Sequence, residues 1–193
     1  AVVLITHDLR LAAHVCDTIG VMYAGELVEM GPGAQVLQSP EHPYTRALKA
    51  ANPPLQGPRR ALPALADLMP GLAALPDLRG CRFAARCPTR SPDCEARIPP
   101  LRDVAPGHAV RCAPACATEA AQEAPGDTLP DTPAADPQAN SGVTPLLRLD
   151  GVGLRYTARR GLLGTRVTHV DAVRSASFEV APGEFVGIVG ESG

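Results

Sequence analysis

Three groups of residues in this chain have types and spacings that could perform chemistry. The run from Phe185 to Gly193 is an apolar strand pattern that leads into a glycine-rich segment. Four cysteines lie between positions 81 and 112, and His7 directly follows an apolar run at residues 2–6. A glycine-rich turn after a strand can bind phosphate, clustered thiols can bind metal, and an imidazole can hydrogen-bond a phosphate and a water molecule.

The C-terminal run could begin a P-loop, whose pattern is G-x-x-x-x-G-K-[ST]. In that loop backbone N–H groups approach the phosphates and the lysine reaches the β- and γ-oxygens. Gly190 fits the first glycine, and Glu191, Ser192 and Gly193 follow it, so the lysine is expected just after Gly193. By itself the run is equally consistent with an ordinary turn, since glycine mainly marks positions with positive φ. The spacing does not match the dinucleotide pattern G-x-G-x-x-G.

The spacing of the four cysteines is C-x5-C-x6-C-x17-C, formed by Cys81, Cys87, Cys94 and Cys112. Structural zinc sites usually begin with a closer C-x2–4-C pair, whereas an iron–sulfur cluster held by four thiolates tolerates irregular loop spacing. The alternative is that all four are free thiols of a structural loop.

Seven arginines lie in or beside this cysteine segment. They could offset the negative charge of a cluster and lower the pKa values of the thiols. They are Arg79, Arg82, Arg86, Arg90, Arg97, Arg102 and Arg111. Outside the four cysteines, Cys16 is expected to be a small buried helix residue, Cys116 a spare thiol, and His108 a turn residue rather than a ligand.

The elements that must position these groups follow from apolar periodicity and turn residues. Residues 2–6 predict a buried strand, Leu9–Thr18 a helix whose first turn Asp8 could cap, and Ala24-Gly25 the turn of a hairpin. Further strands are expected at 19–23, 26–30, 146–149, 152–156, 172–180 and 184–189, and short helices at 34–38 and 44–50.

Composition divides the chain into four parts. Its 193 residues include 21 Pro and 18 Gly, so one compact core over the whole length is not expected. The net charge of −2 argues against nucleic-acid binding through bulk charge, and no apolar run is long enough to cross a membrane. Residues 113–145 have the composition of a disordered acidic linker. The other three parts are residues 1–50, 51–112 and 146–193. The predicted fold class is α/β, in which two partial cassette-like pieces flank an irregular Cys-rich module.

Both end segments resemble parts of ABC ATP-binding cassettes. The run Pro182 to Gly193 is similar to the approach to the Walker A loop, where "G-E" precedes the strand and "G-E-S-G" opens the loop. Leu154-Arg155-Tyr156 is similar to the adenine-stacking segment, and 159–164 to an insertion of peptide importers. Leu4 to Leu9 resembles the switch segment after the Walker B strand, and Val21 to Gly31 the hairpin that follows it.

The most specific string is H-P-Y-T-R-A-L at residues 42–48, which resembles the opening of the C-terminal extension in the peptide and nickel importer branch of that family. The cysteine segment resembles the C-terminal module of the same branch, some of whose members hold a [4Fe–4S] cluster. Because motifs from the end of a cassette precede motifs from the start of one, the resemblance implies an internal piece of a protein with two fused cassettes, cut at both ends.

The resemblance implies an ATP-hydrolysing subunit that uses Mg²⁺ and energises import of dipeptides or oligopeptides. In it His7 contacts the γ-phosphate and places the attacking water, Tyr156 stacks on adenine, and residues 190–193 line the phosphates. His7 and Gly190 are expected to belong to different cassettes. This chain lacks the Walker A lysine, the Walker B carboxylates and the signature motif, so alone it is expected neither to bind ATP tightly nor to hydrolyse it.

The implied partners are two membrane permease subunits fed by a solute-binding protein, with no nucleic acid. The protein would sit peripherally on the cytoplasmic face of the inner membrane, and its cassettes would pair within one chain or in a homodimer. Two alternatives stay open on the residues: a metal-binding regulatory module between inactive cassettes, and a soluble ABC ATPase that is not a transporter.

Overall fold

The computed structural model describes residues 1–51, 69–113, 144–160 and 166–190. The expected linker at 113–145 lies almost wholly outside these residues, as do Cys116 and the glycine-rich residues 191–193. The helices and strands are β1 (Val2–Thr6), α1 (Leu9–Val15), β2 (Thr18–Tyr23), β3 (Glu26–Pro32), α2 (Gly33–Gln38), α3 (Pro43–Ala51), η1 (Leu72–Asp77), η2 (Ala84–Arg86), α4 (Pro92–Ala96), β4 (Arg102–Ala105), β5 (His108–Val110), β6 (Leu147–Arg160), β7 (Arg166–Val180) and β8 (Phe185–Gly190).

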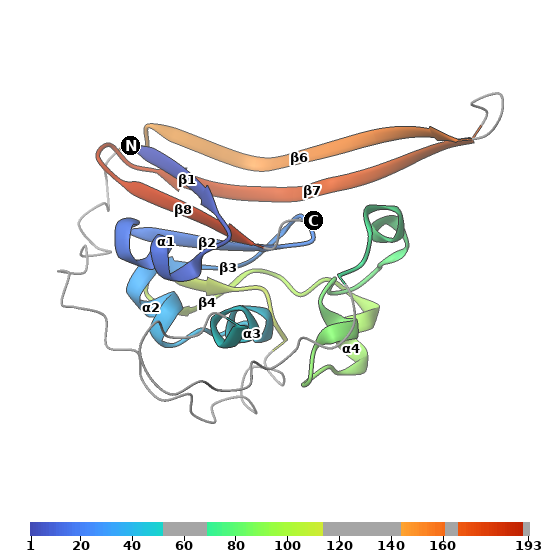
Figure 1. Cartoon of the computed structure of the whole chain (residues 1–193), viewed down its shortest axis with the longest axis horizontal. Coiled ribbons are helices and arrows are strands. Elements are labelled where there is room, and N and C mark those ends of the chain that lie inside the picture. The colour runs from blue at the N-terminus through green and yellow to red at the C-terminus, as the bar shows by residue number, and fades with distance from the viewer. Residues whose placement is uncertain (52–68, 114–143, 161–165, 191–193) are drawn as a thin grey trace.

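A mixed sheet of six strands joins the two ends of the described chain (Figure 1). Its order is β1-β8-β2-β3-β5-β4, and β8 runs parallel to both of its neighbours. Val186 and Val189 of β8 are completely buried, and a strand of this kind is stable when it is hydrogen-bonded on both edges. The division of the sequence into two cassettes does not predict this juxtaposition of the first and last segments.

Strand β1 is less buried than its apolar sequence predicts. It lies at the edge of the sheet, with β8 as its only neighbour among the described strands. Val2, Val3 and Ile5 are exposed, and Ile5 retains 79% of its accessible surface. The strand itself is confirmed, but its expected burial is wrong for the described residues.

Helix α1 begins as expected and ends three residues early. The carboxylate of Asp8 accepts hydrogen bonds from the backbone N–H groups of Arg10 and Leu11, which confirms the predicted cap. Cys16 then adopts an extended conformation, and Thr18 pairs with Val186 of β8. Pairing of this segment with the sheet therefore overrides the helical periodicity that continues to Thr18.

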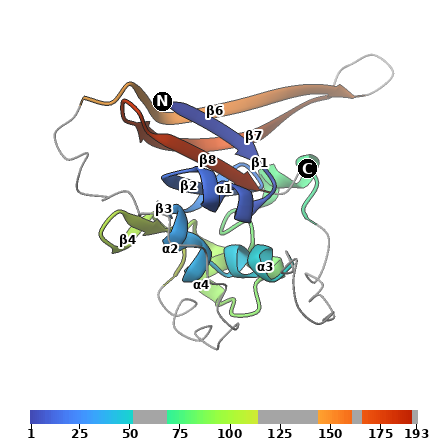
Figure 2. The ribbon, with the colours of Figure 1, turned by 60° about the vertical axis from the view of Figure 1, so that its left-hand side comes forward.

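The long hairpin β6–β7 replaces the separate strands expected between residues 146 and 180. Register shifts between Leu149 and Arg155, where Gly151 has a φ of 58°, absorb the break in alternation and let one strand continue. Figure 2 shows the hairpin lying across one side of the sheet. It is fastened there by the backbone N–H of Arg174, which donates to the carbonyl of Gly25 in the β2–β3 turn at 2.7 Å.

The cysteine segment contains more regular structure than its breaker content predicts. Strands β4 and β5 form a short hairpin, and β5 pairs with β3, so this segment extends the main sheet. Each pairing covers only two or three residue pairs, and such short strands carry almost no periodic signal in the sequence. The segment is therefore attached to the sheet through backbone hydrogen bonds.

We predict that Gly25→Ala destabilises the protein more than Gly183→Ala does. Both glycines have φ near +80°, so both substitutions carry the same backbone strain of about 1–2 kcal/mol. A Cβ at Gly25 would lie 1.8 Å from the carbonyl oxygen of Ala172 in β7, whereas a Cβ at Gly183 would meet nothing within 4 Å. Urea unfolding should therefore show an additional loss of about 1–3 kcal/mol for Gly25→Ala. Equal losses would contradict the packing of β7 on this turn.

Candidate functional site

The four cysteines of the predicted metal site line one cavity. Cys81 and Cys87 flank η2, Cys94 lies in α4, and Cys112 follows β5. The cavity is completed by apolar residues and by one histidine: His42, Pro43, Phe83, Ala84, Pro99 and Ala113. Sequence spacing alone did not show that the thiols converge, because their elements come together through tertiary contacts, among them the pairing of β5 with β3 and the hydrogen bond from the backbone N–H of Cys81 to the carbonyl of Cys94.

Cys81 is not activated in the way that the sequence predicts. None of the described cysteines forms a disulfide. Burial raises the pKa of Cys81 to about 11, which Glu26 and the neighbouring thiols Cys87 and Cys94 reinforce. Cys81 is therefore a protonated, unreactive thiol at neutral pH when no metal is bound. For Cys81 the expectation of a lowered pKa is wrong.

Several of the neighbouring arginines form hydrogen bonds with groups other than the thiols. Arg86 donates to the hydroxyl of Tyr23, and Arg111 donates to the carbonyls of Leu27 and Pro99. Arg102 donates to the backbone carbonyl of Cys112, not to its thiol. These guanidinium groups fasten the cysteine segment to the sheet and to itself.

Arg82 is the most buried of these arginines and lies in an ionic cluster. Its Nε is 3.5 Å from a carboxylate oxygen of Glu26, which also accepts a hydrogen bond from Arg174 of β7 at 2.9 Å. Arg82 also donates to the carbonyls of Ala24 and Asp171. Burial raises the pKa of Glu26 and lowers that of Arg82, while their mutual attraction opposes both shifts. The cluster ties the cysteine segment to both β3 and the long hairpin.

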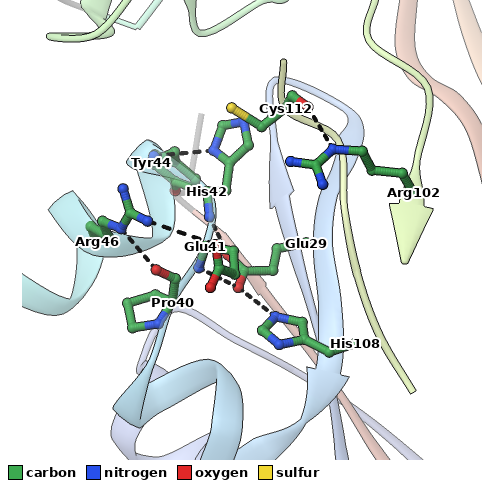
Figure 3. Close-up of polar contacts among 9 residues, drawn as sticks. All are labelled: Glu29, Pro40, Glu41, His42, Tyr44, Arg46, Arg102, His108 and Cys112. Atoms are coloured by element: carbon green, nitrogen blue, oxygen red, sulfur yellow. Dashed lines mark hydrogen bonds and ion pairs between the residues drawn. The ribbon is translucent and has the colours of Figure 1, made fainter. Parts of the chain in front are cut away.

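The carboxylate of Glu29 organises the other side of the cavity (Figure 3). It is completely buried on β3 and accepts hydrogen bonds from the backbone N–H groups of Glu41 and His42 at 2.8 and 2.9 Å. It also accepts one from Nε2 of His108, the first residue of β5, at 2.8 Å. His108 is thus a buried strand residue paired with a carboxylate, and its expected role in a turn is wrong.

His42 connects this carboxylate to the cavity. Its Nδ1 accepts a hydrogen bond from the backbone N–H of Tyr44 at 3.1 Å, so its side chain caps helix α3. Its Nε2 is buried and has no hydrogen-bond partner. Complete burial lowers the pKa of His42 to about 4, with a smaller lowering by Arg46 and opposing effects of Glu29 and the Arg111 carbonyl. The ring is therefore neutral at pH 7.

Sequence reasoning used residues 42–48 only as a family signature and missed both Glu29 and the role of His42. A buried glutamate within an apolar strand is a signal that could have found them, because such a group requires several hydrogen-bond donors. Glu29 follows the apolar pair Leu27-Val28 and precedes Met30. Its donors are 12 to 79 residues away in the sequence.

The cavity contains sulfur donors, but their side chains are not arranged as a metal site. Within residues 1–51, 69–113, 144–160 and 166–190, no group of three or more His, Cys, Asp or Glu side chains is placed to hold a metal ion. The residues that line the cavity nevertheless supply four thiols, one imidazole and no carboxylate. This donor set fits thiophilic metal centres rather than Mg²⁺ or Ca²⁺.

Of the residues predicted to contact nucleotide, the structure describes His7, Gly190 and Tyr156. β1 and β8 are parallel neighbours with Thr6 opposite Val189, so His7 and Gly190 each follow one of these paired residues at the carboxyl ends of the two strands. Ligands commonly bind at this end of parallel strands. Tyr156 is exposed on β6, opposite Val170, and the predicted phosphate contacts Glu191, Ser192 and Gly193 lie outside the described residues. Among the described helices, none is long and apolar enough to cross a membrane.

Several ATP-binding proteins of peptide transporters are similar to this chain. Residues 28–94 match the family model described as "Oligopeptide/dipeptide transporter, C-terminal region". A probable peptide ABC transporter ATP-binding protein of Sinorhizobium fredii is 41% identical over 113 residues, which cover 58% of this chain and 33% of the relative. A probable D,D-dipeptide transport ATP-binding protein of Escherichia coli is 42% identical over 101 residues, with 52% and 30% covered. The dipeptide transport ATP-binding protein of Escherichia coli is 40% identical over 112 residues, with 58% and 34% covered.

The chain spans about a third of the length of these curated relatives. The matched region 28–94 contains Glu29, the string at 42–48 and three of the four cysteines. The sequence resemblance to ATP-binding proteins of peptide and dipeptide ABC transporters is confirmed by these relatives.

We predict that the metal-free protein loses stability as the pH falls from 6.5 to 4. The pKa of His42 is about 4 in the folded protein and about 6.5 when unfolded, so the unfolded chain binds more protons in this interval and its population grows. The expected contribution is at most about 3 kcal/mol. Urea unfolding of the wild type and of His42→Asn, with chelator and reductant present, should show that the variant lacks this part of the pH dependence. Parallel curves for the two proteins would refute the assignment.

Proposed function

We propose, from this relationship, that the chain is part of an ATP-binding subunit that energises the import of peptides through an ABC transporter. The observation that carries the proposal is the match of residues 28–94 to the C-terminal region of oligopeptide/dipeptide transporters. The relatives' names refer to peptides and dipeptides, which favours this substrate class over a role outside transport. The partners would be membrane permease subunits, and the place of action the cytoplasmic face of the membrane.

The proposed nucleotide chemistry centres on His7 and the glycine-rich end of β8. With ATP and Mg²⁺ bound, residues 190–193 would contribute backbone N–H groups to the phosphates, and Tyr156 would stack on the adenine. His7 would hydrogen-bond the γ-phosphate and the attacking water, a positioning role that phosphoryl transfer requires. The register of β1 with β8, with Thr6 opposite Val189, supports a placement of both residues at the same edge of a sheet, where each would serve the nucleotide site of its own cassette.

We also propose that two cassettes are fused in the protein, because cassette-end motifs precede cassette-start motifs along the chain. In that arrangement residues 1–50 end one cassette, 51–112 form its extension, 113–145 are the linker and 146–193 begin the next. β8 would then occupy in its own cassette the place between two parallel strands that it takes here between β1 and β2. Pairing of the cassettes would occur within one chain or in a homodimer.

For the ATPase, we predict that His7→Ala in the intact transporter subunit lowers the rate of ATP hydrolysis by about 10²-fold or more while nucleotide affinity changes little. The reason is that a positioned imidazole acts on the attacking water rather than on the adenine. His14→Ala is the matched control, since His14 is exposed on the neighbouring helix α1. Hydrolysis by His7→Ala at the rate of His14→Ala would refute the assigned role.

A second function is favoured by the convergence of the four cysteines on one cavity. We propose that Cys81, Cys87, Cys94 and Cys112 hold a [4Fe–4S] cluster, which would supply a redox-active or purely structural group. Metal binding would need the thiols to lose their protons, so it would overcome the raised pKa of Cys81 and release protons. The absence of a carboxylate from the cavity lining supports a sulfur-bound group.

We predict that the full chain, reconstituted anaerobically with ferrous iron and sulfide, retains about four iron and four sulfide per chain after desalting. Cys112→Ser should retain less than about half of this iron, because one of four thiolates is lost. Cys16→Ser is the control: Cys16 packs on β8, where a Cβ at Gly187 would lie 2.9 Å from its sulfur, and it does not line the cavity. Background iron in the wild type, or equal iron in both variants, would contradict the cluster.

A further inference from the structure

The imidazole of His42 presents an unused polar atom at the four-cysteine cavity. His42 is completely buried, and its Nε2 makes no hydrogen bond of normal geometry in the protein, although the backbone carbonyl of Arg111 lies close enough to the ring to oppose the lowering of its pKa. The same side chain lines the cavity together with the four cysteines. Figure 3 shows its ring beside the side chain of Cys112, at the start of helix α3. Buried polar groups of this kind are normally hydrogen-bonded, so this nitrogen indicates that something else occupies the cavity.

The hydrogen bond at the other ring nitrogen decides what Nε2 can do. Nδ1 lies 3.1 Å from the backbone nitrogen of Tyr44, whose N–H can only donate. Nδ1 must therefore be the unprotonated nitrogen of the neutral ring, which places the proton on Nε2. In this tautomer Nε2 is a hydrogen-bond donor and has no lone pair for a metal.

Glu29 fixes the position of this donor. Its carboxylate binds the backbone N–H of His42 at 2.9 Å and that of Glu41 at 2.8 Å, and it is itself held by His108. The ring of His42 also packs against Phe83, with the ring centroids 5.8 Å apart. The backbone and the ring are thus both held, so the direction of the Nε2–H bond is set before any ligand enters.

We propose that His42 is a positioning residue whose Nε2–H donates a hydrogen bond to a sulfur atom of the metal–sulfur group held by the four cysteines. This inference rests on the proposed cluster and adds a residue to it. The accepting atom is a thiolate or a bridging sulfide. Both carry negative charge, and the surrounding Pro43, Phe83, Ala84 and Pro99 exclude water that would otherwise supply the donor.

A donor in this position has a predictable effect on the cluster. A hydrogen bond to sulfur is stronger when the cluster carries one more electron, because the sulfur is then more negative. It therefore stabilises the reduced state and raises the reduction potential. A histidine that served only as a helix cap would not have this effect.

Two substitutions distinguish the role of Nδ1 of His42 from the role of Nε2. In His42→Asn the side-chain oxygen can take the place of Nδ1 and keep the cap on Tyr44, but no group reaches the cavity. In His42→Gln the longer side chain can place its NH₂ near the position of Nε2 and keep the donor. Each variant, as the full chain reconstituted anaerobically with ferrous iron and sulfide, is compared with the wild type by redox titration.

We expect His42→Asn to make reduction of the cluster about tenfold less favourable, a fall of about 59 mV for a one-electron couple, and His42→Gln to stay closer to the wild type. Thermal unfolding of the metal-free variants, with His42→Asn close to the wild type, verifies that the fold is kept. An unchanged potential in His42→Asn at full iron content overturns the role of His42 and leaves the cluster intact. A wild type that retains no iron overturns the cluster and the role of His42 together.

Discussion

The arrangement of the cysteine segment depends on the buried carboxylate of Glu29. A charged group without exposure to water is stable only if its oxygen atoms are hydrogen-bonded. Glu29 meets this requirement with donors from two distant places, the loop before α3 and the start of β5. The hydrogen bonds to this one carboxylate therefore bring helix α3 and β5, the strand that precedes Cys112, together at β3. Removal of the carboxylate would leave three donors unpaired, at a cost of about 1–3 kcal/mol each.

A second buried carboxylate, Glu26, organises the opposite side in a different way. Its partners are two arginines, Arg82 from the cysteine segment and Arg174 from the long hairpin. Buried ion pairs of this kind add little net stability, but loss of one partner leaves an uncompensated charge. The cluster thus specifies where the hairpin and the cysteine segment meet the β2–β3 turn. Glu26 and Glu29 lie three residues apart on one strand, so β3 connects both networks.

The cavity between these two networks is lined by groups that carry no charge at neutral pH, among them Cys81 and His42. Burial keeps Cys81 protonated and His42 neutral, and the lining contains no carboxylate. Such surroundings disfavour isolated charge, and they strengthen any interaction between a bound anionic sulfur and a fixed donor. Of the seven arginines expected to offset a cluster's charge, Arg82, Arg86, Arg102 and Arg111 hold the cysteine segment in place through hydrogen bonds. The chemistry of the cavity therefore depends on what it binds, and the proposed metal would couple its occupancy to the stability of the module.

The sequence by itself determined the local elements, since apolar periodicity, the cap at Asp8 and the turn at Ala24-Gly25 all act within a few residues. It also showed the resemblance to ATP-binding proteins of peptide transporters, because the string at residues 42–48 is specific. The tertiary structure alone decided that β8 inserts between β1 and β2, that four thiols meet at one cavity, and that His42 lies beside them. These features depend on pairings such as that of Glu29 with His108, 79 residues apart. Local sequence carries no record of them, because a buried carboxylate requires donors without specifying where in the chain they lie.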